Sequence, residues 1–130
     1  MGHVQKADLG SRVLVVDDYD TMRKVWQRQL RNLGFGTVEI AADVYQAAER
    51  VRQGDFDLII SDWKMKPVSG VEFLKMIRDC DQGQAIKFLM ITEGPSGPSV
   101  DESMEAGADA FLPKPFNEAK LAASLDALFS

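Results

Sequence analysis

The chain has 130 residues, of which 45% are hydrophobic, so it can bury one ordinary core but is too short for a second domain of usual size. Its net charge of −5 disfavours nucleic acid as a partner, because phosphate binding requires clustered Lys and Arg. No apolar run approaches the roughly 20 residues that span a bilayer, and the first residues lack a hydrophobic signal region. We therefore expect a cytoplasmic protein of one domain, without membrane insertion.

Two residue types that often carry chemistry occur only once each. The single histidine, His3, lies in a polar lead-in over residues 1–11, and we assign it no role. The single cysteine, Cys80, cannot form an internal disulfide, and it lies in an apolar-periodic stretch where a small buried thiol is common. We expect Cys80 to be buried and structural.

Short runs rich in β-branched residues alternate with longer segments of helical periodicity, which predicts repeated strand-helix units around a parallel sheet. The expected strands are 12–16, 37–41, 57–61, 86–91 and 109–112. One helix follows each strand, and glycines at 34 and 54 are expected to end the first two. The expected N-terminal caps of the second to fifth helices are Asp43, Ser69, Ser99 and Asn117.

Near-continuous hydrophobic strands suit a sheet covered on both faces, and right-handed crossovers then give a doubly wound arrangement. The expected fold class is α/β, a doubly wound five-stranded parallel sheet with five helices. In such sheets, ligands bind beyond the carboxyl ends of the strands. Those ends carry the candidate site residues Asp17, Asp18, Asp62, Thr92 and Lys114.

Three carboxylates at one sheet edge repel one another, so they require shared protons or a divalent cation, for which Mg²⁺ is the natural choice. The same repulsion predicts that replacing Asp17 or Asp18 with alanine leaves the stability of the metal-free protein unchanged or raised. An aspartate can attack phosphorus if Lys114 and the metal neutralise the transferring oxygens, and the Thr92 hydroxyl can bond the arriving phosphoryl group. Considered singly, each aspartate is as typical of a structural residue in a turn or helix cap as of a functional one. Met22 and Trp26 are interpreted as core residues, and the five-residue conjunction favours a functional site.

Four stretches of the sequence resemble the receiver domains of response regulators, namely residues 13–23, 59–65, 90–92 and 106–116. The resemblance extends over a domain spanning residues 12–130 and is greatest with stand-alone regulators of the chemotaxis type. It implies a flavodoxin-like sheet with strand order 2-1-3-4-5. It also implies a signalling phosphoacceptor of a two-component system, which catalyses only its own phosphorylation and dephosphorylation.

The resemblance further assigns roles to individual residues. Asp62 is expected to accept phosphate from a histidine kinase or histidine phosphotransfer protein. The Mg²⁺ ligands are expected to be Asp17, Asp18, Asp62 and the backbone carbonyl of Lys64. Thr92, Phe111 and Lys114 complete the switch, and the Lys114–Pro115 bond is expected to be cis. A downstream protein is expected to bind the face formed by the fourth helix, the fifth strand and the fifth helix.

The sequence departs from the family pattern at several positions. Lys66 stands where proline is usual, with Pro67 one residue later, so the loop into the third helix is expected to take another path. Glu93 replaces a small residue at the mouth of the site, where it can pair with Lys64. Phe111 replaces a tyrosine and cannot donate a hydroxyl hydrogen bond, so conformational coupling through this side chain rests on packing. The first helix carries a basic face, which suits either an acidic phosphodonor or solvent, formed by Arg23, Lys24, Arg28 and Arg31.

Two alternative functions remain open. A phosphatase or phosphotransferase of another α/β family would also use an aspartate nucleophile, but such enzymes place a second aspartate close to it after one strand. Here the Asp17–Asp18 pair is separated from Asp62. The other alternative is a receiver fold that has lost phosphorylation and only binds partners. Glu93 and the altered loop favour that alternative, whereas the presence of all five site residues opposes it.

Overall fold

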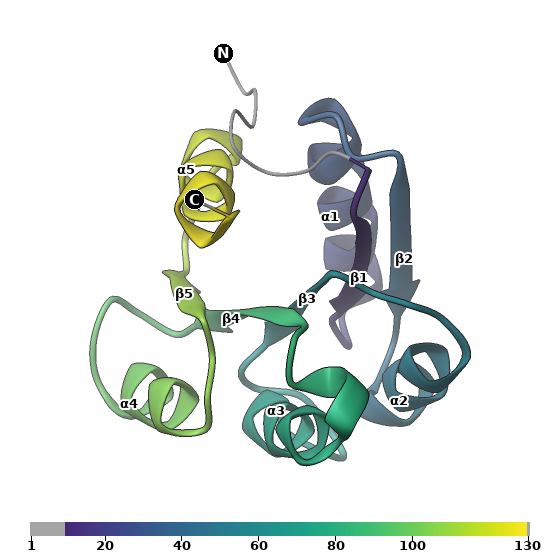
Figure 1. The fold of residues 1–130 in the computed structure, drawn as a ribbon. Coiled ribbons are helices and arrows are strands. Elements are labelled where there is room, and N and C mark those ends of the chain that lie inside the picture. Colours follow the sequence, from purple (N-terminus) through teal and green to yellow (C-terminus); the bar gives the residue numbers. More distant parts are fainter. Residues whose placement is uncertain (1–9, 130) are drawn as a thin grey trace.

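The described residues, 10–129 of the computed structural model, form five strands that alternate with five α-helices (Figure 1). The strands are β1 (Arg12–Val16), β2 (Thr37–Ala41), β3 (Leu58–Asp62), β4 (Lys87–Thr92) and β5 (Ala110–Pro113). The helices are α1 (Asp20–Asn32), α2 (Val44–Gln53), α3 (Gly70–Asp79), α4 (Pro98–Glu105) and α5 (Glu118–Phe129), with a short 3₁₀ turn, η1 (Asp81–Gly83). All strand pairs are parallel, in the order β2-β1-β3-β4-β5. The expected fold class and strand order are confirmed.

Helices cover both faces of the sheet: α1 and α5 lie on one face, and α2, α3 and α4 on the other (Figure 1). Successive residues of β1 point to opposite faces, so Val13 and Val15 pack with Trp26 of α1, whereas Leu14 packs with Phe73 of α3. All four residues from 13 to 16 are completely buried. The continuous apolar run of this strand is therefore explained by burial on both sides.

The strand ends differ slightly from the expected ones. β1 and β2 have the expected bounds, whereas β3, β4 and β5 each begin and end one residue later. The reason is that Asp62 pairs with Ile91 in the β3–β4 ladder and Thr92 pairs with Pro113 in the β4–β5 ladder. Two candidate site residues are thus the last residues of strands, which fixes their backbones.

Three of the four expected helix caps are confirmed. The side chains of Asp43, Ser69 and Asn117 accept hydrogen bonds from backbone N–H groups three residues later. Each cap supplies an acceptor for an N–H group that has no partner inside the helix.

The expected cap of α4 at Ser99 is wrong. The helix begins at Pro98, two residues before the start that a cap at Ser99 would give, and Gly97 precedes it with φ of 104°. Proline suits the first helical position because its missing N–H would have no partner there. The hydroxyl of Ser99 instead accepts a hydrogen bond from the backbone N–H of Glu93 at 3.2 Å.

Cys80 is exposed, so the expectation that it is buried is wrong. Cys80 directly follows α3 and has an extended backbone conformation. It lies three positions after Ile77, which is the last buried residue of the helix. The apolar periodicity therefore stops before the cysteine. Most of the expected lead-in, including His3, lies outside the described residues. Among the helices of residues 10–129, none has both the length and the apolar character needed to cross a membrane.

The first residue of α3, Gly70, packs against the end of β3. Its N–H donates to the carbonyl of Trp63 at 3.0 Å, and a Cβ atom at this position would lie 2.0 Å from the carbonyl oxygen of Asp62. Only a residue without a side chain allows the helix to approach the strand so closely.

We predict that Gly70→Ala lowers the free energy of unfolding by about 1–3 kcal/mol, because the added methyl group displaces α3 from the strand end. Gly36→Ala is the matched control, since a Cβ atom at Gly36 meets nothing within 4 Å; its effect should stay within about 0.5 kcal/mol. Urea denaturation of both variants measures the difference. Equal stabilities of the two variants would contradict the close-packing argument.

Candidate functional site

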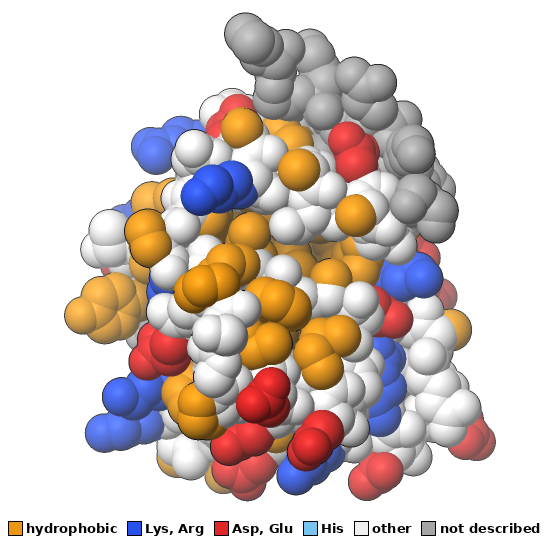
Figure 2. All heavy atoms as spheres, turned by 90° about the vertical axis from the view of Figure 1, so that its left-hand side faces the viewer, with side chains coloured by type: hydrophobic (Ala, Val, Ile, Leu, Met, Phe, Trp, Pro, Cys, Tyr) orange, Lys and Arg blue, Asp and Glu red, His pale blue; other side chains and the backbone are white. Residues whose placement is uncertain are grey.

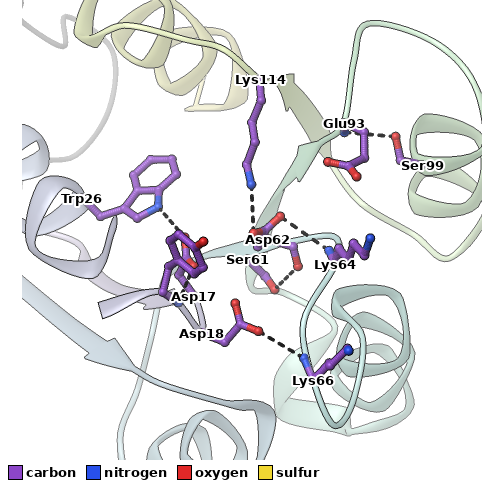
Figure 3. A network of polar contacts seen from close by, with 11 residues as sticks. Asp17, Asp18, Trp26, Ser61, Asp62, Lys64, Lys66, Glu93, Ser99 and Lys114 are labelled. Atoms are coloured by element: carbon purple, nitrogen blue, oxygen red, sulfur yellow. Dashed lines mark hydrogen bonds and ion pairs between the residues drawn. The ribbon is translucent and has the colours of Figure 1, made fainter. Parts of the chain in front are cut away.

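The carboxyl ends of the strands bring the candidate residues to one edge of the sheet (Figure 3). Asp17 and Asp18 follow β1, Asp62 ends β3, and Lys114 follows β5. One oxygen from each of the three aspartates lies within 4.8 Å of the others. We call Asp17, Asp18 and Asp62 the acidic cluster.

Asp62 is 8% exposed and has a cationic partner. The Lys114 ammonium donates to its Oδ2 at 3.0 Å, while the backbone N–H of Lys64 lies 3.5 Å from its Oδ1, which is a long contact. Burial opposes the charged form of Lys114, but the hydrogen bond and the attraction to Asp62 raise the pKa of Lys114 above its usual value. The lysine therefore stays charged beside the carboxylate.

Asp17 is the most buried member of the cluster, at 3% exposure. Its Oδ1 accepts from the backbone N–H of Tyr19 at 3.0 Å, and its Oδ2 accepts from the indole N–H of Trp26 at 3.2 Å. Burial raises the pKa of Asp17, and the charge of Asp62 adds to this effect, whereas the bonds from Tyr19 and Trp26 lower the pKa. The net direction is upward, because burial and the charge of Asp62 outweigh the two hydrogen bonds.

Sequence reasoning identified Trp26 as a core residue, which is confirmed by its 2% exposure. It missed the hydrogen bond to Asp17, because helical periodicity identifies the buried face of a helix but not the acceptor that a buried indole reaches. An aromatic donor on the helix directly after an acidic strand end is the only sequence signal that pointed to this contact.

Asp18 is exposed and is held by the loop between β3 and α3. Its Oδ2 accepts from the backbone N–H of Lys66 at 3.3 Å. Proline, the residue expected here from the family pattern, has no N–H to donate. The departure at Lys66 thus supplies Asp18 with a hydrogen bond.

The charges of the site are unbalanced. Among residues 10–129, the ion pair from Lys114 is the only one that reaches the acidic cluster, so three carboxylates and one ammonium group leave two negative charges. All candidate ligands are oxygen atoms, which hard divalent cations prefer. The acidic cluster therefore fits the binding of a metal ion. The hollow around it has a volume of about 370 Å³ and is lined by Asp17, Asp18, Tyr19, Met22, Asp62, Lys64, Met65, Lys66, Glu93 and Lys114.

Thr92 and Phe111 lie on the strands beside the cluster. Thr92 is completely buried, and its hydroxyl donates to the carbonyl of Gly94 at 2.8 Å. Phe111 is half-buried on β5. The Lys114–Pro115 peptide bond is cis, as expected, and the Lys66–Pro67 bond is also cis.

Lys64 and Glu93 line the same hollow from different loops. Within the described part of the chain, the ion pairs include none between these two side chains. The expected pairing across the mouth of the site is therefore not formed in this structure. Figure 3 shows the backbone of Glu93 joined to Ser99 instead.

Comparison with known proteins gives consistent matches over most of the chain. The family described as "Response regulator receiver domain" matches residues 13–126. Chemotaxis protein CheY-3 of Vibrio cholerae serotype O1 is 36% identical over 118 residues, which cover 91% of each protein. Chemotaxis protein CheY of Pseudomonas aeruginosa is 30% identical, over 91% of this chain and 95% of the relative.

Solved structures show the same likeness. Chemotaxis response regulator CheY4 of Vibrio cholerae superposes with a TM-score of 0.85 and 34% identity, covering 92% of this chain and 98% of that one. The receiver domain of sensor histidine kinase PA1611 of Pseudomonas aeruginosa has a TM-score of 0.83 and 26% identity, with 92% and 98% covered. That structure is described as having a magnesium ion coordinated in its active site cleft.

The hydrogen bonds of Asp17 argue against the expectation that replacing it leaves the stability of the metal-free protein unchanged. We predict that Asp17→Ala lowers the free energy of unfolding of the metal-free protein by about 1–3 kcal/mol, because two N–H groups lose their acceptor. Asp18→Ala should cause no loss, since Asp18 is exposed and its removal relieves repulsion. Denaturation with urea in the presence of a chelator measures both. Equal losses in the two variants would contradict this assignment.

Proposed function

This chain belongs to the response regulator receiver domain family, and we propose on that basis that Asp62 accepts a phosphoryl group from a phosphohistidine of a kinase or phosphotransfer protein. The observation that carries the proposal is the pairing of Asp62 with Lys114 inside the acidic cluster. CheY-like receivers are signalling proteins, and we infer that this one catalyses only its own phosphorylation and dephosphorylation.

The transfer forms a bond between phosphorus and a carboxylate oxygen of Asp62. The phosphorus–nitrogen bond of the donor breaks, and the leaving imidazole nitrogen keeps the electron pair and is neutralised by a proton from solvent. Lys114, whose ammonium lies 3.0 Å from Asp62 Oδ2, is placed to neutralise charge on the transferring oxygens. Its raised pKa keeps this positive charge available.

The cation of this site is proposed to be Mg²⁺, held by Asp17, Asp18, Asp62 and the backbone carbonyl of Lys64. Bound there, it neutralises the phosphoryl oxygens and the excess charge of the cluster. The residues that hold it are already oriented, because each carboxylate accepts at least one N–H group. The magnesium ion named for the Pseudomonas aeruginosa receiver supports the same metal.

The response is proposed to pass through Thr92. Its hydroxyl donates to Gly94, so it can bond a phosphoryl oxygen only by giving up that contact. The Gly94 carbonyl then loses its partner, and residues 94–98, which lead into α4 and include two glycines and two prolines, are free to move relative to the end of β4. Phe111 on β5 then adjusts by packing, since it has no hydroxyl group to donate.

Output is proposed to pass to a protein partner through the face formed by α4, β5 and α5. Figure 2 shows hydrophobic side chains gathered across the middle of this face, with acidic side chains below them. Met104 of α4 is 42% exposed, and Phe111 is half-buried. An apolar centre with a charged rim is typical of a protein interface.

The phosphodonor is proposed to approach over α1. Arg23 is not part of the free basic face, because it bonds the carbonyl of Asp17 and the side chain of Asp20. The other basic residues of α1, Lys24, Arg28 and Arg31, are exposed, and Lys24 also lies 3.8 Å from the carboxylate of Asp20. Beside α1 and the β5–α5 loop lies a hollow of about 420 Å³, lined by Tyr19, Met22, Val25, Gln29, Lys114, Pro115 and Phe116. A protein donor can use this hollow and the basic residues together.

We predict that Asp62→Asn abolishes labelling by acetyl phosphate in the presence of Mg²⁺, because an amide is nearly isosteric but cannot act as the nucleophile. Asp79→Asn is the matched control, since Asp79 is an exposed aspartate at the C-terminal end of α3, whereas the N-terminal end of this helix packs against Asp62. Intact-mass spectrometry measures the phosphorylated fraction. Equal labelling of Asp62→Asn and the parent would exclude this site, and an unlabelled parent would favour a binding module without phosphorylation.

A second variant tests the switch. Thr92→Ala should still be phosphorylated, but beryllofluoride should cause a smaller change in hydrogen exchange over residues 93–105, because the hydroxyl that links β4 to Gly94 is absent. Thr92→Ser keeps a hydroxyl and should respond like the parent. The assignment fails if the alanine variant shows the full exchange response.

A further inference from the structure

We propose that Trp26 is a positioning residue of the metal centre, whose indole N–H holds the carboxylate of Asp17 and whose ring joins that carboxylate to the loop carrying Lys114. This inference rests on the proposed function of the acidic cluster. Figure 3 shows the indole N–H directed at the carboxylate of Asp17.

The hydrogen bond is buried at both ends. Trp26 is 2% exposed and Asp17 is 3% exposed, and their atoms Nε1 and Oδ2 lie 3.2 Å apart. The other oxygen of Asp17 is held by the backbone N–H of Tyr19. The N-cap residue Tyr19 and the mid-helix residue Trp26 thus supply one donor to each oxygen, and each oxygen still has a lone pair for a cation.

The ring of Trp26 has a second contact that extends this support. It stacks on Phe116 with a centroid distance of 4.8 Å and an interplanar angle of 29°. Phe116 lies two residues after Lys114, whose ammonium contacts Asp62. A single indole therefore connects Asp17 after β1 with the loop that places Lys114 after β5, so the two ends of the acidic site share one rigid support.

A purely structural tryptophan would need only an acceptor for its N–H group and apolar neighbours for its ring. Its loss would change stability and leave the affinity for a cation unaltered. A hydrogen bond that orients a metal ligand acts differently, because the ligand without it must be ordered when the ion binds; loss of such partners typically costs about 10–100-fold in metal affinity. Measuring Mg²⁺ affinity beside the free energy of unfolding therefore distinguishes a structural role of Trp26 from a role in positioning the metal ligand.

The test is Mg²⁺ binding measured by isothermal titration calorimetry. Trp26→Phe keeps an aromatic ring, although a smaller one, and removes the N–H donor, and we expect it to weaken Mg²⁺ binding by about tenfold. Phe116→Leu keeps the donor but removes the stack, and it should weaken binding in the same direction. Leu30→Val is the matched control: Leu30 lies on the same helix and in the same core cluster as Trp26, so this variant should lose stability with unchanged affinity.

A second measurement uses the unaltered chain. The ¹H–¹⁵N signal of the Trp26 indole, identified by its absence from Trp26→Phe, should shift during a Mg²⁺ titration with the calorimetric midpoint. A Trp26→Phe affinity within about twofold of the parent, or an indole signal that does not shift, overturns the proposal. An unchanged affinity in Phe116→Leu overturns its aromatic part. A parent that binds Mg²⁺ but is not labelled by acetyl phosphate overturns the proposed function alone, whereas a parent that binds no Mg²⁺ overturns both.

Discussion

Negative charge concentrated at one edge of the sheet is the constraint to which the rest of the site is adapted. The acidic cluster places carboxylate oxygens within 4.8 Å of one another, and such charges repel strongly where water is partly excluded. The structure offsets this repulsion with the ammonium group of Lys114 and with N–H donors directed at the carboxylates. The remaining negative charge makes a divalent cation a favourable occupant.

The sheet can hold this unfavourable arrangement because its central strands are buried on both faces. Residues 13–16 and 58–61 are completely buried, and Val16 pairs with Ser61 in the β1–β3 ladder. Asp17 and Asp62 each follow this pair by one residue, so their backbones cannot move apart without breaking the ladder. Packing energy in the core thus maintains a site that electrostatics alone would open.

The sequence predicted the strands and the candidate site residues because both depend on strong, repeated signals: apolar runs, helical periodicity and the position of polar residues at strand ends. The prediction was wrong where a short local pattern was overridden by an adjacent residue or by the end of a helix. Proline at 98 displaced the expected Ser99 cap, and the end of α3 left Cys80 outside the core. The roles of Trp26 and Gly70 were missed because a side-chain direction and a close backbone approach exist only in the folded chain.

The departure at Lys66 shows how a local difference is absorbed. A proline at this position would leave Asp18 without the hydrogen bond from the β3–α3 loop, because proline has no N–H group. With Lys66 in place, its backbone N–H reaches Asp18 Oδ2 at 3.3 Å, just as the N–H of Tyr19 reaches Asp17. Both aspartates after β1 are therefore oriented by backbone donors, one from the N-cap residue of α1 and one from the loop after β3. The loop with Lys66 thus supplies a donor to Asp18, and the acidic cluster is assembled with it in place.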